Sequence, residues 1–309
     1  MIDHIPPQRS GNVRGLPYAL GAYGIWGFLP VLYYFLRDVP PLELVGWRVI
    51  LSLPVCALFL VLFRQTPQFR TALRQPRTLA LLLASATLIG VNWLVFVYAI
   101  QTGHVLATSL GYYINPMINV LLGTVFLKER LAPLQWVAVA LALTGVALLA
   151  LGALNALWIS LTLGISFASY GLIRKIAPVE SLPGLTIETL LWLLPALGVV
   201  IFHAGGEAGS ALAREDATPL WLAGTGLLTA IPLILFATAA RLMDYSALGF
   251  VQYLAPSISF VLGITLFEEP LEPVQLATFG LIWTGIGFFS WSALAERRRA
   301  RALRAQPPT

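Results

Sequence analysis

The sequence predicts an all-α integral membrane protein with ten transmembrane helices, arranged as two five-helix repeats of inverted topology. Three observations lead to this prediction: the composition, an internal repeat and the distribution of basic residues. The chain of 309 residues is 58% hydrophobic and 11% charged, and its mean hydropathy is +0.81. A soluble domain is usually about 45–50% apolar and about 25% charged. The composition therefore indicates a chain that lies largely within a lipid bilayer.

The apolar segments have the length that a membrane span requires. About 20 mostly apolar residues cross the hydrocarbon core of a bilayer, which is about 30 Å thick. Charged residues and Pro/Gly clusters separate ten such segments, and the first of them is expected to be a retained span rather than a cleaved signal peptide. The expected spans are 16–36, 43–63, 78–101, 105–127, 134–151, 154–175, 185–203, 219–240, 246–267 and 274–295. Only 64–77 and 204–218 are substantial loops, so consecutive helices are expected to be antiparallel neighbours.

The second half of the chain repeats the first half at a constant offset in residue number. Residues 113–118 read YINPMI, and residues 253–258 read YLAPSI. The same offset joins Gly123 to Gly263, Glu129 to Glu269, Pro133 to Pro273, Gln135 to Gln275 and Thr144-Gly145 to Thr284-Gly285. We therefore expect one repeat at 16–151 and a second at 154–295, between an N-terminal tail (1–15) and a basic C-terminal tail (296–309).

The basic residues orient the spans, because Lys and Arg accumulate in cytoplasmic loops. With the N-terminus inside, only Arg37 and Arg214 lie in outside loops. Sixteen basic residues lie on the cytoplasmic side: Arg9, Arg14, Arg64, Arg70, Arg74, Arg77, Lys128, Arg130, Arg174, Lys175, Arg241, Arg297, Arg298, Arg299, Arg301 and Arg304. Both termini are therefore expected to be cytoplasmic, and the basic tail is expected to touch anionic lipid headgroups rather than nucleic acid.

The repeat offset contains five spans, an odd number, so the second repeat must be upside down relative to the first. The loop charges agree with this. The loop at 128–130 (KER) is basic, whereas the equivalent loop at 268–272 (EEPLE) is acidic. Inverted repeats are typical of secondary transporters, whose substrate sites lie near the midplane of the membrane between the repeats.

Two ionisable residues stand inside predicted spans, where charges are costly and usually functional. The repeat offset relates these two residues, Arg48 and Glu188, to each other. Arg48 is a candidate anchor for an anionic substrate group, because guanidinium binds carboxylate bidentately, or it snorkels to the interface. Glu188 is a candidate to bind a cationic group or to carry a proton, or it only stabilises packing. Equivalent depths in inverted repeats place the two toward opposite faces, so they need not pair.

Neutral polar residues form a second candidate set. Tyr112, Asn115 and Asn119 share one helix face, and Gln252, Ala255 and Ser259 form its counterpart. Pro116 and Pro256 free backbone carbonyls within their spans. We expect the two faces to line a central cavity, with interhelical hydrogen bonding alone as the alternative. The full neutral polar set is Asn92, Asn115, Asn119, Gln252, Ser257 and Ser259, with Tyr112, Tyr113 and Tyr253 beside it.

Cofactors and catalysis receive no support from the sequence. The chain has one cysteine, Cys56, and three scattered histidines, so neither an intrachain disulfide nor a metal-ligand spacing is present. It contains no glycine-rich phosphate loop, HExxH or CxxC. An enzyme would need a nucleophile and base or a metal motif, and neither occurs. We therefore expect no cofactor, no metal and no enzymatic activity.

Several stretches resemble the drug/metabolite transporter superfamily, and within it the EamA-type permeases of the RarD family. They are AYGIWGFLPVLY, ELVGWRVILS, GVNWLVFVYAI, SLGYYINPMINVLLG, SFASYGLIRK, IETLLWLLP and ALGFVQYLAPS. The resemblance covers about residues 15 to 295. It implies a bacterial inner-membrane permease that works by alternating access around a central cavity, with relatives that export amino acids, metabolites or drugs. It also adds Trp26, Asn92 and Trp93 to the cavity.

The expected function is thus a secondary transporter of a small organic solute, with the lipid bilayer as its surroundings. Proton coupling through Glu188 and uncoupled transport both stay open, as do the monomer and the homodimer. A passive channel or facilitator is the alternative, and it predicts a continuous ring of polar residues rather than polarity near the middle of a few spans. A membrane scaffold would want a large soluble domain, which the short loops do not provide.

Overall fold

The structure is a computed structural model that describes residues 14–102, 104–151, 157–206, 209–266, 268 and 273–305. Most of the predicted N-terminal tail, Glu269 with the rest of the acidic loop, the predicted start of the second repeat at 154 and residues 306–309 lie outside the described residues. All regular secondary structure in the described part of the chain is helical.

The helices of the first half follow the predicted spans closely. They are α1 (Leu16–Phe35), α2 (Pro41–Leu62), α3 (Thr66–Leu73), α4 (Pro76–Gln101), α5 (Val105–Val125) and α6 (Pro133–Ala150). The second half contains α7 (Leu157–Ile176), α8 (Ser181–Ala204), the short 3₁₀ turn η2 (Ala211–Ala213), α9 (Thr218–Leu242), α10 (Tyr245–Gln252), α11 (Leu254–Thr265) and α12 (Pro273–Ala305).

Eight of the described segments are long and apolar enough to cross a membrane, with α10 and α11 counted together. The chain is therefore a multi-pass membrane protein. α1 and α5 have 20 and 21 residues, but they are not among the eight. α1 carries glycine, tyrosine and proline, which lower its hydropathy. The expectation of ten spans remains a prediction for these two helices.

Two predicted segments differ from the structure in detail. The loop 64–77 contains the short helix α3, and the predicted span 246–267 consists of two helices that meet at Tyr253. Pro256 lies in the first turn of α11, where a missing N–H costs little because that group has no intrahelical partner. Pro116, in contrast, lies inside α5, which continues through it. Of these two prolines, only Pro256 lies next to a break in its helix, whereas α5 continues through Pro116.

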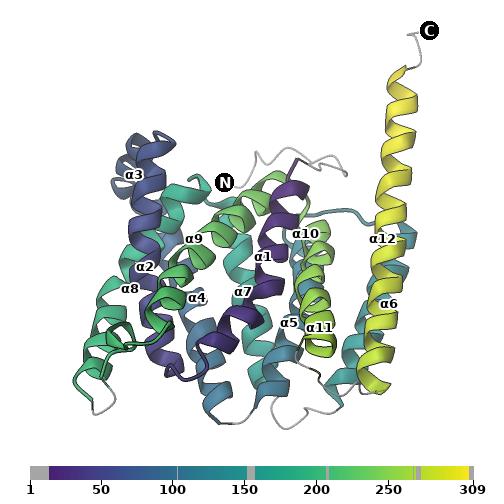
Figure 1. Cartoon of the computed structure of the whole chain (residues 1–309). Helices are drawn as coiled ribbons and strands as arrows, with labels where there is room; N and C mark the ends of the chain where they lie inside the picture. The colour runs from purple at the N-terminus through teal and green to yellow at the C-terminus, as the bar shows by residue number, and fades with distance from the viewer. Residues whose placement is uncertain are drawn as a thin grey trace.

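Helices at equivalent positions of the two halves begin at equivalent residues, and the first helix of each half packs on helices of the other half. α1 packs on α9 and α11, while α7 packs on α4 and α5; α2 contacts α8, and α6 contacts α12 (Figure 1). The matched first residues are Pro41 with Ser181, Val105 with Tyr245, and Pro133 with Pro273. Lys128 and Glu268, which the same offset relates, both have a positive φ, of 55° and 52°. This conformation is uncommon for residues other than glycine, so the correspondence extends to the loop backbone.

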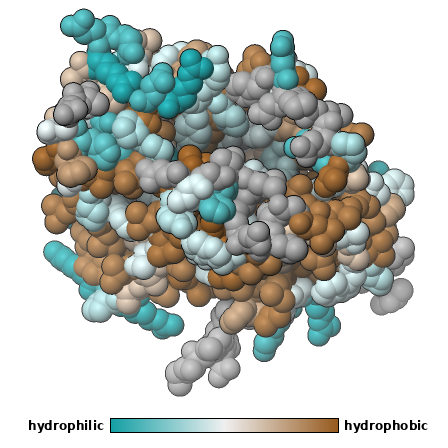
Figure 2. Space-filling model, turned by 90° about the horizontal axis from the view of Figure 1, so that it is seen from below, coloured by the Kyte–Doolittle hydropathy of each residue, from teal (hydrophilic) through white to brown (hydrophobic). Residues whose placement is uncertain are grey.

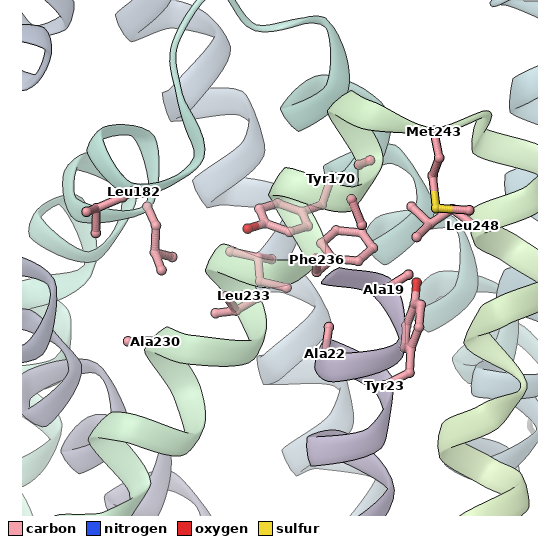
Figure 3. Close-up of a cluster of buried hydrophobic side chains, with 14 of the residues drawn as sticks. Ala19, Ala22, Tyr23, Tyr170, Leu182, Ala230, Leu233, Phe236, Met243 and Leu248 are labelled. Carbon is pink, nitrogen blue, oxygen red and sulfur yellow. The ribbon is translucent and has the colours of Figure 1, made fainter. Parts of the chain in front are cut away.

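The largest buried cluster lies where α1, α7, α8, α9 and α10 meet (Figure 3). The rings of Tyr170 and Phe236 stack there, with centroids 6.1 Å apart and planes 13° apart. Outside this core the chain exposes many large apolar side chains. Seen from the end opposite the C-terminus of α12, apolar surface covers much of the molecule, with hydrophilic groups around it (Figure 2). The large apolar side chains that the spans expose suit contact with lipid.

The last helix is longer than a membrane crossing needs. α12 has 33 residues, which corresponds to about 50 Å at 1.5 Å per residue. Its apolar part is Pro273–Ala295. The remainder projects beyond the other helices, on the same side of the molecule as the start of α1 (Figure 1).

Candidate functional site

A small cavity lies among α2, α4, α7, α8 and α9. It offers about 20 Å³ to the centre of a water molecule, which is room for about one water. The lining consists of Val49, Ser52, Ile89, Trp93, Tyr170, Leu185, Glu188, Thr189, Trp192, Thr229 and Leu233. Trp93 and Glu188 are thus the predicted site residues that line this cavity directly.

Glu188 is buried, at 3% exposure, and has several partners. The Arg174 guanidinium lies 3.6 Å from its carboxylate. The Tyr170 hydroxyl donates to Oε2 over 3.4 Å, and the Ser85 hydroxyl donates to Oε1. The three partners come from α7 and α4, whereas Glu188 comes from α8. This carboxylate is therefore neutralised and hydrogen-bonded rather than open to a cation.

Arg174 is the residue of this site that the sequence failed to reveal. It was counted among the cytoplasmic basic residues, but its side chain is completely buried. Besides Glu188, it donates from Nη2 to the Ser181 carbonyl over 2.8 Å. Its position in the last turn of α7, next to Lys175, makes it resemble a loop-flanking charge. Gly184 is the sequence feature that accompanies this burial, because a Cβ at position 184 would collide with the Arg174 guanidinium.

Arg48 contacts two residues of the cavity lining but is not part of the lining itself. Its Nε donates to the Thr229 hydroxyl over 3.1 Å, and its guanidinium stands 5.8 Å from the centre of the Trp93 ring, within cation–π range. Tyr112 packs against the Phe96 ring, with centroids 6.2 Å apart, and is 38% exposed. Among the described residues, Arg48 forms no ion pair. The structure therefore brings Arg48 and Trp93 together, whereas Arg48 forms no ion pair with Glu188.

The predicted amide residues form a second polar group between α5 and α10. Asn119 Nδ2 donates to Gln252 Oε1 over 2.9 Å, and the Tyr23 hydroxyl approaches the same oxygen at 3.4 Å. Asn115 is completely buried, yet neither polar atom of its side chain has a hydrogen-bond partner among the described residues. Asn119 Oδ1 is also buried and has no hydrogen-bond partner among the described residues. We call Asn115, Asn119 and Gln252 the amide cluster.

The other predicted neutral residues join helices. Asn92 Nδ2 donates to the Leu163 carbonyl at 2.9 Å and to the Ser166 hydroxyl at 3.1 Å. The Tyr253 hydroxyl donates to the Tyr113 carbonyl over 3.2 Å, so the two repeat-related tyrosines touch. Further along the chain, the Ser257 hydroxyl accepts from the Trp283 indole at 2.8 Å, and Ser259 donates to the Gly27 carbonyl at 3.1 Å.

Aromatic rings separate the cavity from the amide cluster. Trp26 packs against Tyr23, Phe167 and Phe236, with centroid distances of 5.5, 5.8 and 5.8 Å. Tyr170 belongs both to this group and to the cavity lining, while Tyr23 reaches the amide cluster. Figure 3 shows the rings of Tyr170 and Phe236 beside each other, with Tyr23 of α1 to one side.

Charged side chains also fasten one end of the bundle. The Glu129 carboxylate accepts from the backbone N–H groups of Tyr245 at 2.6 Å and Ser246 at 2.8 Å, at the N-terminus of α10. Lys175 Nζ donates to the carbonyls of Ala240 at 2.7 Å and Met243 at 2.6 Å, at the C-terminus of α9. Among the described residues, no cluster of His, Cys, Asp or Glu is suited to hold a metal.

Comparisons with known proteins agree with this architecture. The EamA-like transporter family matches residues 13–151. An uncharacterized transporter of Pseudomonas aeruginosa is 42% identical over 288 residues, which cover 93% of this chain and 96% of the relative. Protein RarD of Streptomyces exfoliatus is 41% identical, covering 96% of this chain and 94% of the relative. For RarD of Escherichia coli K12 the identity is 38%, with 93% and 97% covered.

A solved structure with 17% identity superposes with a TM-score of 0.74 and covers 91% of this chain and 99% of its own. At that identity the likeness concerns the fold alone. The relatives, in contrast, are similar over nearly the whole length and carry transporter or RarD names. The chain therefore belongs to the EamA-like transporter family and, within the drug/metabolite transporter superfamily, to the RarD-type membrane transporters.

Proposed function

We propose that the chain moves a small organic solute across the bacterial inner membrane by alternating access of two inverted five-helix repeats, with both termini cytoplasmic. The repeats are 16–151 and 154–295. The sequence repeat, the matched helix starts and the exchange of helix partners between the halves support this arrangement. The bias of basic residues supports the orientation.

One observation carries this function above the others. Arg48 and Glu188, which occupy equivalent positions of the two halves, flank a single cavity inside the bundle. Ionisable groups in the membrane interior are expensive and commonly mark a solute or proton pathway. A scaffold would gain nothing from an arginine that is held beside a cavity and that no described carboxylate pairs.

The closed geometry favours a carrier over a channel. The cavity has room for about one water molecule, and aromatic rings fill the space between it and the amide cluster. A carrier can close around its site and open it to one side at a time. A passive channel or uncoupled facilitator would instead need a continuous polar path.

Proton coupling is part of the proposal. Glu188 would exchange a proton when its contact with Arg174 is loosened during the conformational change. Asn115, whose two amide atoms lack partners in the described part of the chain, would offer them to the solute as it passes the aromatic rings. Both roles depend on groups that are buried in this conformation and change partners in another.

Counterflow in proteoliposomes tests the function. The purified protein is reconstituted into proteoliposomes, and each batch is loaded with one unlabelled member of a panel of amino acids, carboxylates and drugs. The uptake of the same solute in labelled form from outside is then followed. We expect exchange that Asn115→Ala weakens, while Glu188→Gln retains exchange but loses accumulation driven by a pH gradient. If the wild type exchanges a solute and neither Asn115→Ala nor Glu188→Gln changes that exchange, Asn115 and Glu188 are not part of the transport site. Unsaturable flux without exchange would favour the channel.

A further inference from the structure

We propose that the transported solute is an organic anion whose carboxylate or similar oxyanion group binds Arg48. This rests on the proposed function and adds the chemical class of its substrate. It follows from the charges around the cavity, from the free donors of Arg48 and from the side chains that surround them.

The charges around the cavity leave one cation that no described carboxylate neutralises. Glu188 lines the cavity, but Arg174 lies 3.6 Å from it and neutralises it, with both side chains buried. Arg48, which contacts the lining residues Thr229 and Trp93, forms no ion pair among the described residues. The three groups together therefore carry a net positive charge when no solute is bound.

Glu43 does not compensate Arg48, although both lie on α2 and Glu43 is buried. Its carboxylate accepts from the Trp47 indole at 3.2 Å and from the Ala211 backbone at 2.8 Å. Five residues along an α-helix correspond to a rotation of about 140°, so the two side chains leave α2 in different directions. Glu43 fastens the segment before α9 and does not face the cavity.

The donors of Arg48 are arranged for an oxyanion. The Thr229 hydroxyl accepts the hydrogen bond from Arg48 Nε, so the two terminal nitrogens of the guanidinium remain for a ligand. The Trp93 ring faces the guanidinium, with its centre 5.8 Å away. A carboxylate that receives two parallel N–H groups forms the strongest kind of charge-assisted pair.

Cations and zwitterions fit this site less well. A cationic group would have to break the contact of Glu188 with Arg174, which would leave a buried arginine without its partner. Breaking such a pair is strongly unfavourable. An anion, in contrast, adds the missing charge beside Arg48, and the rings of Trp93, Trp192 and Tyr170 that line the cavity suit an apolar solute body.

Matched solutes provide the test. Each set shares one carbon skeleton and differs in charge. The first set is 3-phenylpropionate, 3-phenylpropionamide, 3-phenylpropylamine and phenylalanine, and the second is propionate, propionamide, propylamine and alanine. Binding is measured as a rise in Tm of the protein in detergent, which passive permeation through lipid does not affect. Exchange is measured in proteoliposomes against protein-free vesicles.

We expect the carboxylates to raise Tm by a few degrees and to exchange, because a ligand that binds only the folded state stabilises it. Arg48→Gln should remove the shift and lower exchange about tenfold or more, whereas Arg48→Lys should keep part of both. Thr229→Val retains the charge but frees Nε, and should weaken binding even if Arg48→Gln fails to fold. Arg214→Gln, a cation of the loop before α9, serves as the matched control and should change nothing.

The outcomes separate this inference from the proposed function. Exchange or stabilisation restricted to amides, amines or amino acids would overturn the anionic substrate and leave a transporter. Carboxylate effects that persist in Arg48→Gln and Thr229→Val would overturn the role of Arg48. Stabilisation by carboxylates without exchange of any solute would overturn transport but retain the anion site.

Discussion

The Arg174 guanidinium lies 3.6 Å from the Glu188 carboxylate, and both side chains are almost completely buried. The pair joins the last turn of α7 to the second turn of α8, with Ser85 of α4 as a third member. A buried ion pair contributes little net stability compared with an apolar pair, but removing one partner leaves an uncompensated charge. The unfolding of single and double variants can therefore distinguish a true pair from mere proximity.

We predict that Arg174→Met lowers the free energy of unfolding by about 3–5 kcal/mol, because the Glu188 carboxylate loses its cation. The double variant Arg174→Met/Glu188→Gln should recover a large part of this loss. Thermal unfolding in detergent, followed by tryptophan fluorescence, measures both. Additive losses in the double variant would show that the two groups do not interact.

Gly184 should tolerate no side chain. A Cβ there collides with the Arg174 guanidinium, whereas a Cβ at Gly198, on the same helix, meets no described atom within 4 Å. We expect Gly184→Ala to lower Tm and to weaken transport, because the arginine must leave its place beside Glu188. Gly198→Ala is the control and should match the wild type. Equal Tm values for the two variants would contradict the tight contact.

Glu129 should stabilise the start of α10 from a distant part of the chain. Its carboxylate accepts from two backbone N–H groups that have no partner within the helix, and negative charge is favourable at this helix end. Glu129→Ala is expected to cost about 1–3 kcal/mol. The exposed residue Glu215 provides the control, since Glu215→Ala should leave Tm unchanged. Hydrogen exchange at Tyr245 and Ser246 should accelerate in the first variant alone.

Asn115 and Asn119 should respond in opposite ways to replacement by leucine. Asn115 is buried, and both of its amide atoms lack partners among the described residues, so Asn115→Leu should raise Tm while it lowers solute exchange. Asn119→Leu breaks a hydrogen bond with Gln252 and should lower Tm, because Gln252 loses a buried donor. A fall in Tm for Asn115→Leu would mean that this side chain has a structural role.

The fold was largely predictable from the sequence because hydrocarbon imposes simple rules on length, polarity and loop charge. The predicted spans match the helices to within a few residues, except where Tyr253 separates α10 from α11 and where α12 continues past the predicted end at 295 to Ala305. The short helix α3 was missed because its apolar pattern is too short to distinguish it from a loop.

The site was only partly predictable, since pairing depends on which helices touch. Arg48 and Glu188 stand out as charges in apolar surroundings, and the structure places both beside one cavity. Arg174 does not stand out, because it lies next to Lys175 at the end of a span and a burying contact leaves no periodic signal. The hydrogen bonds of Asn92 and Asn119 likewise join residues 71 and 133 positions from their partners. Whether the amide cluster also contacts solute stays a prediction.

The projecting end of α12 has a practical consequence for imaging. A protein of this size that is embedded in a detergent micelle offers few features by which single particles can be aligned. Because α12 continues as an uninterrupted helix to Ala305, a soluble helical domain spliced in phase at this point would inherit its direction. Such a fusion would act as a rigid fiducial marker and would report the tilt of α12 and its partner α6 as the transporter changes state.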